Sequence, residues 1–182
     1  QAKGQITDTL YISIGNAKIH TVLTKPANPK ALGIIIAGSG PTDLNRNQTS
    51  IPNNTLLYLS DALAANNIAT VRFDKRGIAG SYDISFKESD ITIDTFANDV
   101  VSITKHFKQQ GFKEIYFIGL SEGSLIGLIA AQNMNIKGFI SLAGAGNPAD
   151  SILKKQLKPQ LPPALYSQTE TLLDSLKNGM TV

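Results

Sequence analysis

The sequence predicts an α/β fold: a mainly parallel sheet with helices on both faces, opened by an antiparallel hairpin at the N-terminus. Two segments of alternating polarity, 6–14 and 17–24, flank Gly15-Asn16, a pair that tolerates the positive φ of a tight hairpin turn. Short apolar runs then alternate with segments of helical periodicity up to residue 146. Repeated strand and helix units of this kind build a parallel sheet, because each helix returns the chain to the start of the next strand.

Each predicted element has a local signal. Continuous apolar runs, typical of strands covered on both faces, occupy 32–37, 68–73, 115–118 and 138–143. Three helices are expected between them: one from the capping candidate Asn54 to Asn66, one that carries Phe96 and Phe107 and ends at Gly111, and one that reaches Met134. Beyond Pro148, two short amphipathic helices are expected on either side of 159–163, with no strand after them.

The composition narrows the classes of function. The net charge of +3 and the scattered lysines argue against a nucleic-acid partner, and no apolar run approaches the roughly 18 residues of a membrane span. The absence of cysteine excludes disulfides and thiolate metal sites, and two distant histidines do not make a metal site, so we expect no metal and no cofactor. Because the chain begins with Gln1 rather than Met, we expect that a preceding segment was removed, and we favour an exported protein without assigning its compartment.

The segment Gly119-Leu120-Ser121-Glu122-Gly123 joins an apolar strand to a helical pattern. A serine at such a bend is forced into a strained backbone conformation, and glycines two residues to either side let strand and helix pass closely. This arrangement is typical of a nucleophile elbow, so Ser121 is the candidate catalytic residue. The alternative is a tight glycine turn with a serine that only caps the helix.

A nucleophilic serine needs an oxyanion hole, and the sequence offers two donors for it. The first is the backbone N–H of Glu122, directly after the serine at the start of the helix. The second comes from the loop after 32–37, where we expect Ser39 to donate and consider Gly40 next. The alternatives there are a plain turn and a phosphate-binding loop, although for the latter Asp43 stands where a third glycine would be needed and Pro41 opposes an immediate helix.

A general base for Ser121 is missing from the pattern. The two histidines, His20 and His106, both precede the serine, whereas the expected order is serine, acid, histidine. His20 shares one face of its strand with Lys18 and Val22 and is expected to be solvated; His106 is expected on a helix surface. The carboxylates after the serine are Glu122, Asp150, Glu170 and Asp174, and none is followed by a histidine. A serine–lysine pair with Lys137 or Lys154 is conceivable, but the spacing gives it no support.

Three motifs together resemble the α/β-hydrolase superfamily, most closely the bacterial serine hydrolases grouped with the S33 serine aminopeptidases and the acyl-CoA thioesterase-like esterases. They are Gly38-Ser-Gly-Pro-Thr-Asp43, Arg72-Phe-Asp-Lys-Arg-Gly77 and Gly119-Leu-Ser-Glu-Gly123. The resemblance implies the α/β-hydrolase fold, with Ser121 as nucleophile and with Asp74, Arg76 and Gly77 shaping the loop after a central strand, most simply as structural turn residues. Leu120 departs from the histidine often found before the nucleophile in these relatives.

The resemblance also implies how the chain is divided. Residues 1–147 correspond to the N-terminal part of the hydrolase core and 148–182 to the start of a helical cap. The family continues past the cap into two further strands, whose loops carry the acid and the histidine. We therefore expect an N-terminal portion, truncated before the last strands of the fold, with the triad acid and histidine absent from it.

The expected function is that of a serine hydrolase acting on ester, thioester or amide bonds of a small-molecule acyl substrate, with these 182 residues inactive on their own. The alternatives are a non-catalytic binding module on the same scaffold and, more remotely, a nucleotide-binding domain. An unfinished sheet leaves an open edge, so we also expect a second chain or the missing C-terminal segment to pair with it.

Overall fold

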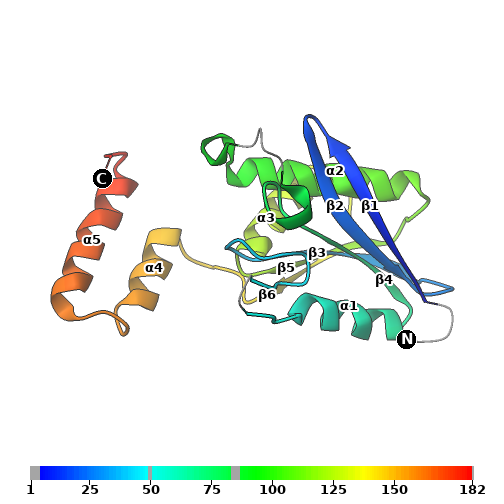
Figure 1. Cartoon of the computed structure of the whole chain (residues 1–182), viewed down its shortest axis with the longest axis horizontal. Coiled ribbons are helices and arrows are strands. Elements are labelled where there is room, and N and C mark those ends of the chain that lie inside the picture. The colour runs from blue at the N-terminus through cyan, green and yellow to red at the C-terminus, as the bar shows by residue number, and fades with distance from the viewer. Residues whose placement is uncertain (1–4, 49–50, 83–86, 182) are drawn as a thin grey trace. The chain divides into compact units, whose positions relative to one another are not determined.

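The computed structural model describes residues 5–48, 51–82 and 87–181 (Figure 1). They fall into two compact units, which meet between Gly144 and Ala145. The first unit holds one sheet with the helices on its two faces, and the second is a pair of helices.

The sheet of the first unit has six strands in the order β1-β2-β4-β3-β5-β6. β1 pairs with β2, and β2 with β4, in antiparallel register, while β4, β3, β5 and β6 run parallel to one another. The predicted hairpin and mainly parallel sheet are therefore confirmed. The strands are β1 (Ile6–Ile14), β2 (Ala17–Lys25), β3 (Ala31–Ile36), β4 (Ile68–Phe73), β5 (Ile115–Leu120) and β6 (Gly138–Leu142).

Three helices cover this sheet, with α1 on one face and α2 and α3 on the other (Figure 1). The alternation along β3 decides which side chain meets which helix: Ile34 and Ile36 belong to the core under α2 and α3, whereas Ile35 packs with Leu56 of α1. Burial on both faces explains why the central strands are almost continuously apolar. The helices are α1 (Thr55–Ala65), α2 (Ile93–Gln109) and α3 (Glu122–Gln132), with 3-10 turns at Ala79–Ser81 and Glu88–Asp90.

The start of α1 corrects one sequence-based expectation. The helix begins directly after Asn54, as predicted, but the Asn54 side chain forms no cap hydrogen bond and its backbone is left-handed, with φ of 53°. Its Oδ1 instead accepts a hydrogen bond from Asn47 Nδ2 at 2.9 Å. Asn54 thus closes the polar loop before the helix, because its side chain turns toward the loop. The first N–H groups of the helix have other acceptors: Thr55 donates to Asn53 Oδ1 at 3.1 Å, and Leu56 donates to the Asn45 carbonyl at 3.3 Å.

The second unit consists of α4 (Ala149–Leu157) and α5 (Pro163–Lys177). Two ion pairs join the helices: Lys154 Nζ lies 2.5 Å from Asp174 Oδ1, and Lys177 Nζ lies 2.8 Å from Asp150 Oδ2. Neither helix has a buried residue. Since no side chain of α4 or α5 is buried, this pair of helices has no hydrophobic core of its own. The exposed ion pairs contribute little to its stability.

Candidate active site

Ser121 lies at a sharp bend between β5 and α3, as the sequence predicted. Its φ of 53° and ψ of −118° fall where side chains are disfavoured, and a residue held there stores roughly 1–3 kcal/mol of strain. The Ser121 backbone N–H donates to the Leu142 carbonyl at 2.8 Å, and Ser124 Oγ donates to the Gly119 carbonyl at 2.7 Å. These bonds fix the bend from both sides. The serine is partly exposed, so its hydroxyl is not enclosed in the core.

Glycine is required on both sides of the bend. A Cβ on Gly123 would lie 2.2 Å from the Ile36 carbonyl oxygen, and a Cβ on Gly119 would lie 2.5 Å from the Gly123 carbonyl oxygen. Both obstacles are backbone atoms, which cannot rotate away. The close passage of α3 over β3 and β5 therefore depends on the absence of these two side chains.

The loop after β3 reaches the same bend. A Cβ on Gly38 would be 3.3 Å from Ser121 Cβ and 3.0 Å from the Leu120 carbonyl oxygen. Gly38 is buried against the elbow, while Ser39 and Gly40 are exposed beside it. The structure thus brings together two segments that are about eighty residues apart in sequence: the loop at Ser39 and the serine with Glu122 behind it.

Lys75 is a member of this site that the sequence reasoning missed. It follows β4 by two residues, and its side chain is only 5% exposed. Its Nζ donates to the Gly38 carbonyl at 2.8 Å and lies 3.2 Å from Glu122 Oε1. The signal was available: Lys75 stands just beyond the carboxyl end of a predicted parallel strand, where the loop at Ser39 and the elbow also emerge.

His20 corrects a second expectation, since it is not solvated. Its Nδ1 lies 2.6 Å from Asp74 Oδ2, and its side chain is 21% exposed. Strand alternation assigned its face correctly, but the segment after β4 folds over that face, so closely that a Cβ on Gly80 would be 2.6 Å from the His20 ring. Asp74 in turn accepts the N–H groups of Leu44 at 2.5 Å and Gly80 at 3.0 Å.

Arg76 anchors the same loop to α2. Its Nε donates to Asp99 Oδ2 at 3.1 Å and its second terminal nitrogen to Asp99 Oδ1 at 2.5 Å, a two-pronged pair. The pKa of Asp99 is raised above its usual value, because the effect of burial exceeds the opposing effect of the hydrogen bond to Arg76. Gly77 follows with φ of 78°. Asp74, Arg76 and Gly77 therefore hold the chain from β4 in place through bonds within the fold.

Asp74→Ala is expected to lower the free energy of unfolding by about 3 kcal/mol, because a buried acceptor of two backbone N–H groups and of the His20 ring is removed. Urea unfolding followed by circular dichroism measures the change. Asp8→Ala is the matched control: Asp8 is exposed on β1, and its replacement is expected to stay within about 0.5 kcal/mol of the parent. Equal midpoints for the two variants would contradict this account of Asp74.

Each of the remaining candidate bases is bound to a partner other than Ser121. His20 bonds to Asp74 and His106 to the Gln110 side chain, and Lys137 pairs with Glu114 at 3.1 Å. Lys154 belongs to the second unit, where it pairs with Asp174.

Over residues 5–48, 51–82 and 87–181, no three His, Cys, Asp or Glu side chains gather as metal ligands would. Across the same ranges, no helix combines the length and apolarity needed to span a membrane.

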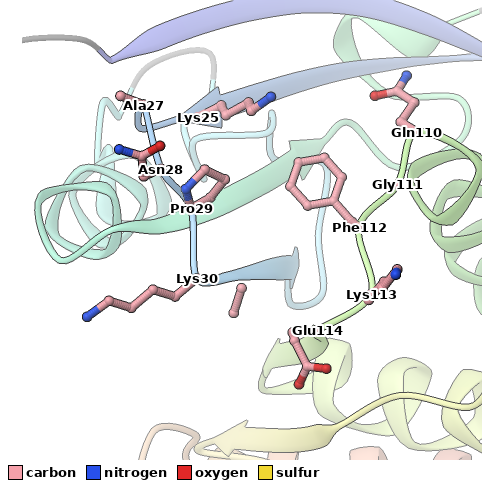
Figure 2. Close-up of a pocket in the computed structure, with 11 residues that line it drawn as sticks. Lys25, Ala27, Asn28, Pro29, Lys30, Gln110, Gly111, Phe112, Lys113 and Glu114 are labelled. Atoms are coloured by element: carbon pink, nitrogen blue, oxygen red, sulfur yellow. The ribbon is translucent and has the colours of Figure 1, made fainter.

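A separate pocket lies at the amino ends of the parallel strands, opposite to the end at which Ser121 lies (Figure 2). It is lined by the residues around the amino ends of β3 and β5, including Lys25, Lys30, Phe112 and Lys113. Lys25 Nζ lies 5.9 Å from the centroid of the Phe112 ring. Because Ser121 is at the carboxyl end of β5, this pocket takes no part in the candidate active site.

Proteins similar to this chain in sequence or in fold include esterases and peptidase-related proteins. No family model matches the chain. Esterase EstD of Thermotoga maritima is 24% identical over 166 residues, which are 91% of this chain and 39% of that enzyme. Est1E of Butyrivibrio proteoclasticus, solved with ferulic acid, has a TM-score of 0.60 at 26% identity over 74% of this chain and 52% of its own.

Two peptidase-related structures are also similar in fold. Proline iminopeptidase of Mycobacterium smegmatis has a TM-score of 0.61 at 19% identity, over 94% of this chain and 55% of its own. A proline iminopeptidase-related protein of Thermus thermophilus reaches 0.68 at 16% identity, over 92% and 56%. The chain thus spans about two fifths of the curated esterase and about half of each of these structures. The resemblance seen in the three motifs is confirmed: the chain has the α/β-hydrolase fold.

Proposed function

We propose that this chain belongs to a serine hydrolase that cleaves ester, thioester or amide bonds through an acyl-enzyme on Ser121. The observation that carries the proposal is the strained, partly exposed serine between two close-packed glycines, with Gly38 of the loop after β3 directly against it. Strain at a single serine is retained where it serves a purpose, since an ordinary turn would relieve it. The names of the similar esterases and peptidase-related proteins support the same reaction class.

In the proposed reaction, Ser121 Oγ attacks the acyl carbonyl carbon while a general base takes its proton. The carbonyl oxygen becomes an oxyanion, which accepts hydrogen bonds from the N–H of Glu122 and the N–H of Ser39. The oxyanion then collapses, and the leaving group departs with the proton that the base took from the serine. Water next attacks the acyl carbon and gives a proton to the base; the bond to Ser121 Oγ breaks, and the serine recovers that proton as the acid is released. The N–H of Glu122 suits this task because it is at the first turn of α3, where amide groups have no helical partner.

The base and its acid partner are proposed to come from sequence outside these 182 residues. Neither histidine within them is hydrogen-bonded to Ser121 in the part of the chain that the structure describes. The 182 residues alone are therefore expected to hydrolyse a p-nitrophenyl ester no faster than background. A longer protein that contains them together with the following sequence is expected to turn the ester over, and to lose this with Ser121→Ala. Ser121-dependent turnover by the short chain would contradict the proposed division of the triad.

The same two proteins test the open edge of the sheet. β6 is an outer strand with Ile140 46% exposed, and we propose that a further strand from the following sequence or a second chain pairs with it. Hydrogen exchange of the β6 amides that face away from β5 is then expected to be slower in the longer protein, or to slow with concentration in the short one. Equally fast exchange in both would contradict this pairing. Residues 148–182 are proposed to be the start of a helical cap.

A further inference from the structure

The cluster of Lys75, Gly38 and Glu122 connects the two backbone groups of the proposed oxyanion hole. The ammonium group of Lys75 donates to the carbonyl of Gly38 at 2.8 Å and lies 3.2 Å from Glu122 Oε1. It also lies 5.3 Å from the centroid of the Phe96 ring, on the side of α2. A long, flexible side chain is thus contacted at three points, by the loop after β3, by α2 and by the start of α3.

The bond to Gly38 determines the direction of a neighbouring donor. The carbonyl of Gly38 and the N–H of Ser39 belong to one planar peptide group, and the described chain contains no cis peptide bond. In a trans peptide these two groups point in opposite directions. By holding the Gly38 carbonyl oxygen, Lys75 therefore turns the Ser39 N–H away from itself. Without that bond, the exposed loop at Ser39 and Gly40 would be free to rotate the peptide.

The contact with Glu122 ties the second donor to the same point. The backbone N–H of Glu122 is one donor of the proposed oxyanion hole, and the carboxylate of the same residue pairs with Lys75. Lys75 is therefore connected to both donors, through the Gly38 carbonyl to Ser39 and through the carboxylate to Glu122. The Lys75 side chain is 5% exposed and that of Glu122 29% exposed. A buried, charge-assisted bond is held more firmly than one between exposed groups, because water competes less for its partners.

A cavity of about 500 Å³ adjoins the cluster, and Gly40, Phe96 and Glu122 line it with Lys75. Lys75 therefore forms part of the wall of this cavity. Within the described residues, the Lys75 ammonium bonds only to Gly38 and Glu122. It is engaged as a donor and is not linked to Ser121, so its role is in holding the loop and not in accepting the proton of the serine.

We propose that Lys75 is a positioning residue, which with the Glu122 carboxylate aligns the N–H groups of Ser39 and Glu122 toward the oxyanion. The proposal rests on the proposed function of Ser121. It predicts a specific kinetic effect: misaligned donors weaken binding of the tetrahedral species more than binding of the substrate.

The test uses Lys75→Met in the longer protein that hydrolyses p-nitrophenyl esters. Met keeps an unbranched side chain at this position and removes the ammonium. We expect kcat to fall by about 10- to 100-fold with KM within twofold, since loss of one oxyanion donor costs about 100- to 1,000-fold in a known case. Affinity for an arylboronic acid, which forms a tetrahedral adduct with serine, is expected to fall by a similar factor. Lys105→Met, an exposed change on α2, is the matched control and is expected to leave both values unchanged.

Glu122→Gln keeps the backbone N–H and an acceptor for Lys75, so its loss in kcat is expected to be smaller than that of Lys75→Met. If Lys75→Met does not fold, the double variant Lys75→Met with Glu122→Gln leaves no unpaired carboxylate and is measured in its place. An unchanged kcat in Lys75→Met, or a fall in kcat accompanied by an equal weakening of substrate binding, would overturn the proposed role of Lys75. The proposed role of Ser121 would not be affected by either result. Absence of both hydrolysis and boronate binding in the parent protein overturns the proposed function itself.

Discussion

Ser121→Ala is expected to lower ester hydrolysis by the longer protein at least about 10⁴-fold, because the atom that forms the acyl-enzyme is removed. The loss is expected in kcat, with the protein folded as before. A p-nitrophenyl ester assay with separate values of kcat and KM measures it. Ser13→Ala, on the exposed face of the distant strand β1, is the matched control and is expected to retain full activity.

The strain at the elbow gives this prediction a second arm. Ser121→Gly removes the same hydroxyl but also relieves the disfavoured backbone conformation at φ of 53°. It is expected to be as inactive as Ser121→Ala and more stable than the parent by about 1 kcal/mol. Residual activity in both variants, near that of the parent, would show that Ser121 is not the nucleophile. Equal stability of parent and Ser121→Gly would show that the serine is not strained.

Gly123→Ala is expected to have the largest effect on folding. Its Cβ would lie 2.2 Å from the Ile36 carbonyl oxygen and 2.5 Å from that of Ala37, so α3 must lift away from β3 to admit a methyl group. We expect a loss of about 3 kcal/mol or more in the free energy of unfolding, at or beyond the upper end of ordinary overpacking. Because the N–H of Glu122 moves with α3, activity is expected to fall even in molecules that fold.

Substitutions at two other glycines provide a comparison for the loss of stability expected in Gly123→Ala. Gly38→Ala meets the Leu120 carbonyl oxygen at 3.0 Å and is expected to cost less, while Gly146→Ala meets nothing within 4 Å and is expected to stay within about 0.5 kcal/mol of the parent. Thermal melts followed by circular dichroism rank the three variants. A melting temperature of Gly123→Ala equal to that of Gly146→Ala would contradict the close passage of helix over strand.

The elements and the elbow were predictable because their signals are local. A strand, a bend with flanking glycines and a helix follow one another within about twenty residues around Ser121, so the order of the strands is not needed to recognise them. The same holds for the hairpin, whose two strands are joined by Gly15-Asn16 and pair as predicted. Periodicity sufficed for these elements because each is specified by neighbours in sequence.

Lys75 and His20 were not predictable by the same means, because their surroundings depend on the order of strands in the sheet. β4 lies between β2 and β3, and β3 lies between β4 and β5. This order places Lys75 against Gly38 and Glu122, and it places Asp74 beside His20. Alternation along β2 assigns His20 to a face of the sheet, but it cannot tell that the segment after β4 covers that face.

Lys75 and Arg76 connect the loop after β4 to the rest of the candidate active site. The loop after β4 is bound to α2 through Arg76 and Asp99 and to the loop after β3 through Lys75 and Gly38. If Lys75 positions the oxyanion hole as proposed, we expect a change in any of these bonds to alter the orientation of the peptide that carries the Ser39 N–H.

The central claim is that the Ser121 hydroxyl is an activated nucleophile facing amide donors, and covalent labelling tests it most directly. The longer protein is treated with a fluorophosphonate, and the modified peptide is identified by mass spectrometry. The account predicts one adduct, on Ser121, that disappears in Ser121→Ala, persists in Ser13→Ala and forms about 10- to 100-fold more slowly in Lys75→Met. A protein that is not labelled, or is labelled at another serine, would contradict it.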